Sequence, residues 1–82
     1  LGAVFPNPAS ALTCIPVQSP SGEEAVIEIT DVFGRIVQTV FSGKVPMGNS
    51  RYFFLANELT PGIYFVTLRS FTAVQVQKII VK

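Results

Sequence analysis

The chain has 82 residues, of which 49% are hydrophobic and 13% are charged, and its net charge is +1. This length supports a single domain, and the apolar composition argues against disorder. The weak and scattered charge excludes a nucleic-acid-binding protein.

No apolar run approaches the roughly 18–20 residues of a membrane-spanning helix, so the apolar residues belong to strands. The opening residues have neither a basic start nor an apolar block of helical length, so they do not resemble a secretory signal. We therefore expect the chain to be part of a larger polypeptide, with residues 1–4 as the end of an upstream linker and residues 1–82 as one domain.

The first marked stretch is VFPNPAS, residues 4–10, in which Pro6 and Pro8 flank Asn7. Each proline fixes its own φ and donates no backbone N–H. Each also pushes the preceding residue toward an extended conformation. Such a segment cannot lie in the middle of a sheet, so we predict a stiff, extended entry or edge segment here, which would make a seventh strand.

Six short runs of β-branched and aromatic residues follow, and no segment keeps a helical period. Short strands separated by turn residues at this spacing are typical of an antiparallel β-sandwich. Cys14 lies in the first run and is expected to be a small buried hydrophobe. The runs cover residues 12–17, 25–32, 36–41, 51–55, 63–69 and 74–81, and their alternation predicts a core that includes Ile27, Ile29, Tyr64, Val66 and Leu68.

Three connections carry clear turn chemistry. Asp31 and Gly34 predict a tight hairpin, because Asp31 can accept from backbone amides and Gly34 can adopt a positive φ. Residues 43–49 contain two glycines and a proline, which predicts a long loop. Within residues 59–62, Pro61 followed by Gly62 predicts a type II turn with these two residues at its centre.

The last run changes phase, because Val74 and Val76 share one face whereas Ile79 and Val81 share the other. A β-bulge near residues 77–78 would restore the alternation. Alternatively, Lys78 lies beside Val76 and Ile80 on an edge strand, where its charge discourages edge-to-edge pairing. The sequence leaves both interpretations open.

Catalytic chemistry is missing from the sequence. There is no histidine, which removes the commonest general base and metal ligand. The carboxylates are scattered, no cluster has metal-ligand spacing, and the glycines form no phosphate-binding motif. We therefore expect no enzyme activity, no catalytic residue, no metal and no cofactor.

Four short motifs occur in order along the chain: P-N-P at residues 6–8, D-x-x-G-R at 31–35, L-x-x-G-x-Y at 59–64 and K-x-x-V-K at 78–82. Together they resemble the carboxy-terminal sorting domain, type A, of cargo proteins of the type IX secretion system, over essentially the whole chain. Each motif is weak alone, whereas the ordered set is specific. The motif residues are Pro6, Asn7, Pro8, Asp31, Gly34, Arg35, Leu59, Gly62, Tyr64, Lys78, Ile79, Ile80, Val81 and Lys82.

The resemblance implies an immunoglobulin-like sandwich of about seven strands that directs an attached passenger across the outer membrane. It implies that the translocon and its shuttle proteins recognise residues 78–82. A sortase-like peptidase at the cell surface would then remove the sorting domain, and the passenger would be anchored there. The passenger would pass through the periplasm and then become surface-bound or secreted. In this picture the last strand presents free main-chain groups and two lysines to a partner.

A second hypothesis is a non-catalytic carbohydrate- or protein-binding sandwich of a secreted enzyme. Such modules offer exposed planar aromatics, and Tyr52 or Phe53 would be the candidates. Aromatics in strands more often belong to a core, and tryptophan is absent.

Overall fold

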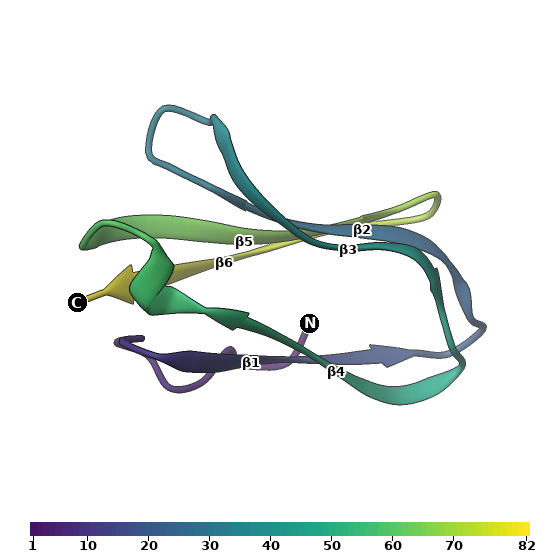
Figure 1. Cartoon of the computed structure of the whole chain (residues 1–82). Helices are drawn as coiled ribbons and strands as arrows, with labels where there is room; N and C mark the ends of the chain where they lie inside the picture. Colours follow the sequence, from purple (N-terminus) through teal and green to yellow (C-terminus); the bar gives the residue numbers. More distant parts are fainter.

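The computed structural model describes residues 1–82 as two antiparallel sheets that face each other (Figure 1). The small sheet pairs β1 (Leu12–Ser19) with β4 (Gly48–Leu55). The large sheet has the order β3-β2-β5-β6 and contains β2 (Glu23–Thr30), β3 (Ile36–Val45), β5 (Gly62–Ser70) and β6 (Val74–Val81). One short 3₁₀ helix, η1 (Ala56–Glu58), joins β4 to β5. The predicted all-β antiparallel sandwich is confirmed.

The strand order matches that of an immunoglobulin-like domain. In that fold the strands named G, F, C and C′ form one sheet, and B and E lie in the other. Here β6, β5, β2 and β3 take the first set of places, and β1 and β4 take the second. No helix in the structure is long and apolar enough to cross a membrane.

The place of a seventh strand is taken by the entry segment, residues 1–9, which is not a regular strand. It makes one antiparallel bridge, Phe5 with Cys14 of β1, and one parallel bridge, Ala9 with Val81 of β6. Between these bridges the chain bends at residues 6–8 rather than running extended. The segment therefore pairs first with one sheet and then with the other, as expected of prolines that cannot continue a sheet ladder.

The core lies between the two sheets and is formed by alternate residues of each strand. All five residues predicted to lie in it are buried, as is Cys14. On β5, every second residue from Tyr64 to Leu68 points inward while the residues between them are partly exposed. This strand is central, between β2 and β6, as its two-sided apolar character requires.

The long loop predicted at residues 43–49 is wrong. β3 continues to Val45 and β4 begins at Gly48, so Pro46 and Met47 alone connect them. Gly43 stays in the ladder opposite Ala25, and Val45 is buried. Packing of Val45 into the core and pairing with β2 outweigh the weak strand preference of glycine.

The last strand has no bulge. β5 and β6 pair in unbroken register from Gly62 opposite Val81 to Arg69 opposite Val74. Of the two interpretations, the edge strand is therefore the right one, since β6 lies at the end of the sheet order. Val74 and Val76 point outward and are more than half exposed, and the bulges of this fold lie instead between β2 and β3.

Candidate functional site: the entry segment and the terminal strand

The entry segment covers the outer edge of the terminal strand. The Ala9 backbone N–H donates to the Ile80 carbonyl at 2.7 Å, and the Lys82 N–H donates to the Ala9 carbonyl at 2.9 Å. Ahead of the prolines, Phe5 exchanges two backbone hydrogen bonds with Cys14, at 3.1 and 2.8 Å. Residues 5–9 thus tie the beginning of the chain to β1 and to the end of β6.

Asn7, the polar residue between the two prolines, hydrogen-bonds to the terminal strand through its side chain. Neither Pro6 nor Pro8 can donate a backbone hydrogen bond to β6. The Asn7 side chain does so instead: its Nδ2 donates to the Lys78 carbonyl at 3.3 Å, and its Oδ1 accepts from the Ile80 N–H at 3.0 Å. An asparagine amide carries both a donor and an acceptor, so it replaces the missing backbone groups.

Two glutamines of β6 hold the residues ahead of Asn7. The Gln77 side-chain oxygen accepts from the Val4 N–H, and that of Gln75 accepts from the Leu1 backbone nitrogen. Val4 is buried in the core. These contacts account for the phase change in β6, because the inward positions near its start carry glutamines that bind the entry segment. The assignment of residues 1–4 to a linker stays a prediction.

The sequence predicted that the last strand would present free main-chain groups, and the structure shows that several of these groups are hydrogen-bonded. Its main-chain groups at Lys78, Ile80 and Lys82 are paired with the entry segment. What remains accessible there is the set of outward side chains: Lys78 and Lys82 are exposed, and Ile80 is 41% exposed. Ile79 and Val81 are buried and hold the strand in the core.

The D-x-x-G-R motif forms the hairpin between β2 and β3, as predicted. Asp31 Oδ1 accepts from the backbone N–H groups of Phe33 and Arg35 at 2.9 and 3.0 Å, and its Oδ2 accepts from Arg35 Nε at 2.9 Å. Gly34 has φ 82°, which few other residues adopt without strain. Each motif residue therefore has a structural role in the turn.

The same contacts set the charge state of Asp31. Desolvation raises the pKa of its carboxyl group, but the hydrogen bonds from the Arg35 and Phe33 amides and from the Arg35 side chain, with the positive charge of Arg35, outweigh it. The net pKa is lower than that of a free aspartate. A carboxylate that is held ionised in this way stabilises the turn and is not suited to donate a proton.

The L-x-x-G-x-Y motif forms a corner ahead of β5. The Tyr64 hydroxyl donates to the Thr60 carbonyl at 2.6 Å and lies 3.0 Å from the Thr60 hydroxyl. A tyrosine near the start of strand F that bonds back to the preceding backbone is the tyrosine corner of immunoglobulin-like domains. The predicted type II turn is wrong, since Gly62 has φ 157° rather than about 80°. Gly62 already pairs with Val81 at the start of β5.

Three of the four motifs lie at one end of the sandwich, and the fourth joins them there. Thr30 pairs with Phe65, and Gly62 pairs with Val81. These pairings bring the hairpin, the tyrosine corner and the end of the chain to the same end of the sandwich. Figure 1 shows them together at the end that carries the C-terminus. Asn7 then binds the terminal strand within this region. The clustering of these motifs required long-range pairing, so sequence alone did not show it.

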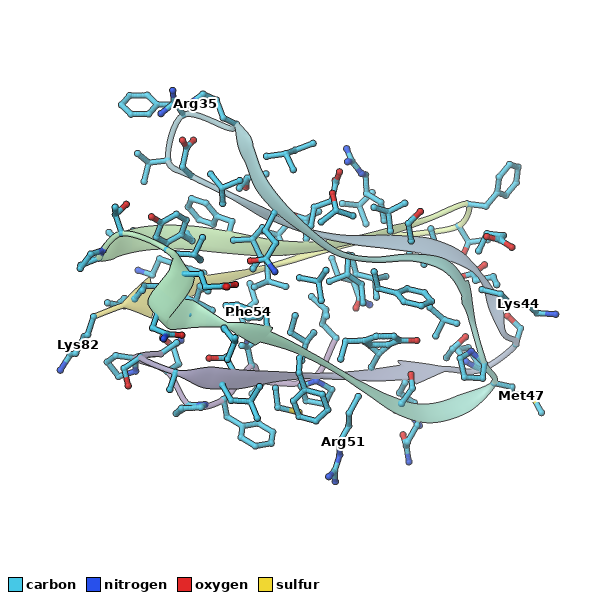
Figure 2. All side chains as sticks on the ribbon, in the orientation of Figure 1. Arg35, Lys44, Met47, Arg51, Phe54 and Lys82 are labelled. Atoms are coloured by element: carbon cyan, nitrogen blue, oxygen red, sulfur yellow. The ribbon has the colours of Figure 1, made fainter.

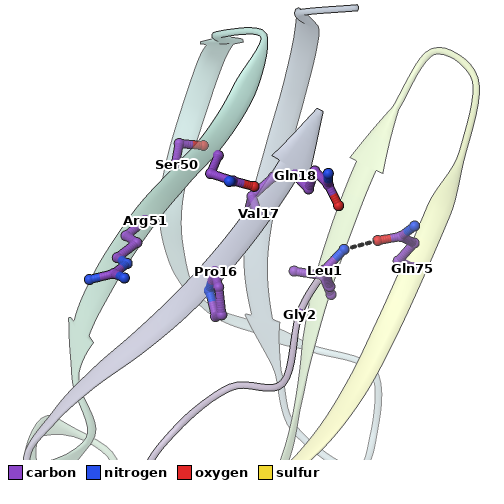
Figure 3. A pocket seen from close by; sticks show the side chains of 9 residues that line it. Leu1, Gly2, Pro16, Val17, Gln18, Ser50, Arg51 and Gln75 are labelled. Carbon is purple, nitrogen blue, oxygen red and sulfur yellow. Dashed lines mark hydrogen bonds between the residues drawn. The ribbon is translucent and has the colours of Figure 1, made fainter. Parts of the chain in front are cut away.

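The hollow at the side of the sandwich has no catalytic constellation (Figure 3). Its polar lining includes the amides of Gln18, Asn49 and Gln75, and Arg51 is its only titratable side chain. The Ser50 hydroxyl is buried without a partner, but no base lies beside it. The structure also contains no group of three or more metal-ligating side chains.

The candidate aromatics of the binding-module hypothesis lie on opposite faces of β4. Tyr52 packs its ring against Phe41 between the sheets, with ring centroids 4.6 Å apart. Phe53 points outward and is about half exposed. A single outward ring on this strand provides no row of sugar-stacking aromatics.

The fold and the marked residues thus define an immunoglobulin-like module whose motifs build turns and a capped terminal strand. A family model described as the secretion system C-terminal sorting domain matches residues 3–82. The chain therefore belongs to the family of type IX secretion C-terminal sorting domains. No curated protein matches it.

Membership gives the domain its role as the C-terminal sorting signal for type IX secretion. It serves a passenger protein to which it is attached, interacts with the secretion machinery, and leads to export to the cell surface or the medium. A sorting domain of this kind is not catalytic in itself.

Proposed function

We propose that the terminal strand, residues 78–82, is the part of this sorting domain that the translocon and its shuttle proteins recognise. The observation that carries the proposal is the exposure of Lys78, Ile80 and Lys82 on a strand that the entry segment fixes in place. A rigid strand presents its side chains at low entropic cost to a partner. The lysines can steer association with an acidic surface.

The entry segment limits how a partner can bind the terminal strand. Because Asn7 and Ala9 already fill the edge of β6, a partner that pairs with this edge must displace residues 7–9. Recognition without displacement uses the outward side chains alone. The proposal takes the second route, because the side chains are exposed while the main-chain groups are occupied.

The further steps are proposed from family membership. The passenger crosses the periplasm, and a sortase-like peptidase then removes the domain and the passenger is anchored at the surface. The domain itself takes part in these steps by binding and contributes neither a cofactor nor a catalytic group.

Removing the last three residues is a poor test, because Val81 is buried and its loss would damage the fold. We instead replace Lys78 and Lys82 by glutamine in a fusion of residues 1–82 to a periplasmic reporter, in a cell with a type IX system. The matched control replaces Lys44 and Arg51 by glutamine, since both are exposed and lie away from the terminal strand. Both double variants change the net charge equally.

The proposal predicts that the K78Q/K82Q fusion accumulates in the periplasm while the control is exported like the wild type. Resistance of the retained fusion to protease shows that its sorting domain is folded. Equal export of the two double variants would contradict recognition through these lysines.

A further inference from the structure

The outward side of the large sheet carries an apolar surface at the end where the chain terminates. Strand pairing places Ile36 beside Thr30, Thr30 beside Phe65, and Phe65 beside Lys78. Ile63 and Ile80 form the neighbouring pair at the end of the sheet. We name this surface, made of Ile36, Ile63, Phe65, Lys78 and Ile80, the outer terminal face.

These side chains point away from the core. Tyr64 and Val66 are buried on β5. Because successive side chains of a strand alternate in direction, the neighbouring Ile63 and Phe65 lie on the opposite side. Ile36, Ile63 and Ile80 are 54%, 45% and 41% exposed, and Phe65 is partly exposed. Figure 2 shows side chains projecting outward from the large sheet, opposite those that fill the space between the sheets. Ile63, Phe65 and Ile80 adjoin one another on β5 and β6, and Thr30 lies between Phe65 and Ile36. Exposed apolar patches of this kind mark interaction sites.

The charge on this surface is unbalanced. The structure has two ion pairs, and these take up Asp31 with Arg35 and Glu28 with Arg69. Lys78 has no acidic partner, although it lies within the apolar surface, and neither has Lys82 at the chain end. The surface therefore combines apolar side chains with an unpaired positive charge on its edge strand, β6.

The hairpin between β2 and β3 borders this surface. Ile36 follows Arg35 directly, and Figure 1 shows the hairpin rising outward from the large sheet, away from the small one. Phe33 at its tip is 79% exposed, with the Arg35 guanidinium 5.4 Å from its ring centre. Three elements far apart in sequence thus supply one side of the molecule.

We infer that the outer terminal face is a docking surface for a protein of the secretion machinery that presents apolar side chains and a carboxylate opposite Lys78. The inference rests on the proposed function, since Lys78 and Ile80 belong to both sites. It extends recognition from the terminal strand to β5 and β3, through Ile63, Phe65 and Ile36, none of which is a motif residue. An apolar centre with charge at its edge is the ordinary composition of a protein interface.

Charge and composition favour a protein over a membrane. Attachment to anionic lipid through basic residues takes clusters of about four to eight of them, whereas this face and the chain end supply Lys78 and Lys82. The chain also has no tryptophan, the residue that with tyrosine marks membrane interfaces. The flat apolar strand surface instead matches the apolar part of a protein partner.

The test uses the reporter fusion in a type IX-competent cell, with Ile63→Thr and Ile36→Thr as separate variants. Threonine keeps the β-branched shape and strand preference while removing apolar contact. Val74→Thr is the matched control, because Val74 is 62% exposed on the same side of the same sheet but at its opposite end. Protease resistance of the periplasmic fusion reports folding, and having two variants guards against misfolding of one.

For a central contact of the interface we expect export of the folded Ile63→Thr and Ile36→Thr fusions to fall about tenfold or more, with Val74→Thr unchanged. Lys78→Glu should be exported less than Lys78→Gln, since reversal places like charges together. Normal export of both threonine variants, with the wild type exported, overturns the inference and leaves the proposed function intact. Failure of the wild-type fusion to be exported overturns the proposed function itself.

A second measurement tests whether the outer terminal face binds a lipid membrane instead of a protein. Purified wild-type fusion is sedimented with vesicles of phosphatidylethanolamine and phosphatidylglycerol, and we expect it to remain in the supernatant. Co-sedimentation that Ile63→Thr abolishes would overturn the assignment of a protein partner.

Discussion

Replacing Tyr64 with phenylalanine tests the corner that holds the start of β5. The tyrosine is 7% exposed, and its hydroxyl donates to the Thr60 carbonyl at 2.6 Å. One such hydrogen bond contributes about 0.5–1.5 kcal/mol to the free energy of unfolding. Because Thr60 is exposed, water can reach its carbonyl in the variant, which limits the loss to about 1 kcal/mol. In a domain of this size that lowers Tm by roughly 4–8 °C.

The control is Tyr52→Phe, the same chemical change on the neighbouring sheet. Tyr52 is partly buried against Phe41, and its hydroxyl makes no hydrogen bond in the structure. We expect its free energy of unfolding to change by less than about 0.5 kcal/mol. Urea denaturation of both variants measures the difference, with equal m-values showing that the unfolded states are comparable. Equal losses in the two variants would refute a stabilising role for the Tyr64 hydroxyl.

Three further variants test the hairpin and the core. Because the folded-state pKa of Asp31 is lowered, its contribution is complete above the unfolded pKa and is lost as pH falls through the lower folded value. The stability difference between wild type and Asp31→Asn should therefore shrink as urea midpoints are compared from pH 6 to pH 2, and a constant difference would contradict the lowered pKa of Asp31. Gly34→Ala should cost about 1–2 kcal/mol because φ is 82°, and Gly34→Asn should cost less, since asparagine tolerates this region; equal losses would point to another cause. Ile27→Ala, at a fully buried position, should cost about 2–5 kcal/mol, and a smaller loss by calorimetry would mean that the core relaxes around it.

Local sequence patterns predicted much of the fold. The inward residues of β2 and β5 follow from strict alternation, and the Asp31 hairpin follows from side-chain and glycine chemistry within five residues. These features depend on neighbours along the chain. The sandwich class followed from the number and spacing of such runs.

Features that depend on long-range pairing could not be predicted in the same way. Gly43 and Pro46 indicate a loop locally, yet pairing with β2 and burial of Val45 extend the strand through Gly43 to Val45. Likewise, nothing near Asn7 in sequence indicates Ile80, which lies 73 positions away. The one local signal was the asparagine itself, because between two prolines without a backbone N–H its side chain offers both a donor and an acceptor to a neighbouring strand.

The sorting role is tested most directly by the fate of a reporter that carries residues 1–82 at its C-terminus. The fraction of reporter at the surface and in the medium is measured in a type IX-competent strain and in the same strain without the translocon. A sorting domain predicts export in the first and periplasmic retention of a folded fusion in the second. Retention in both strains, or equal export from both, would contradict the role of this chain as a type IX sorting signal.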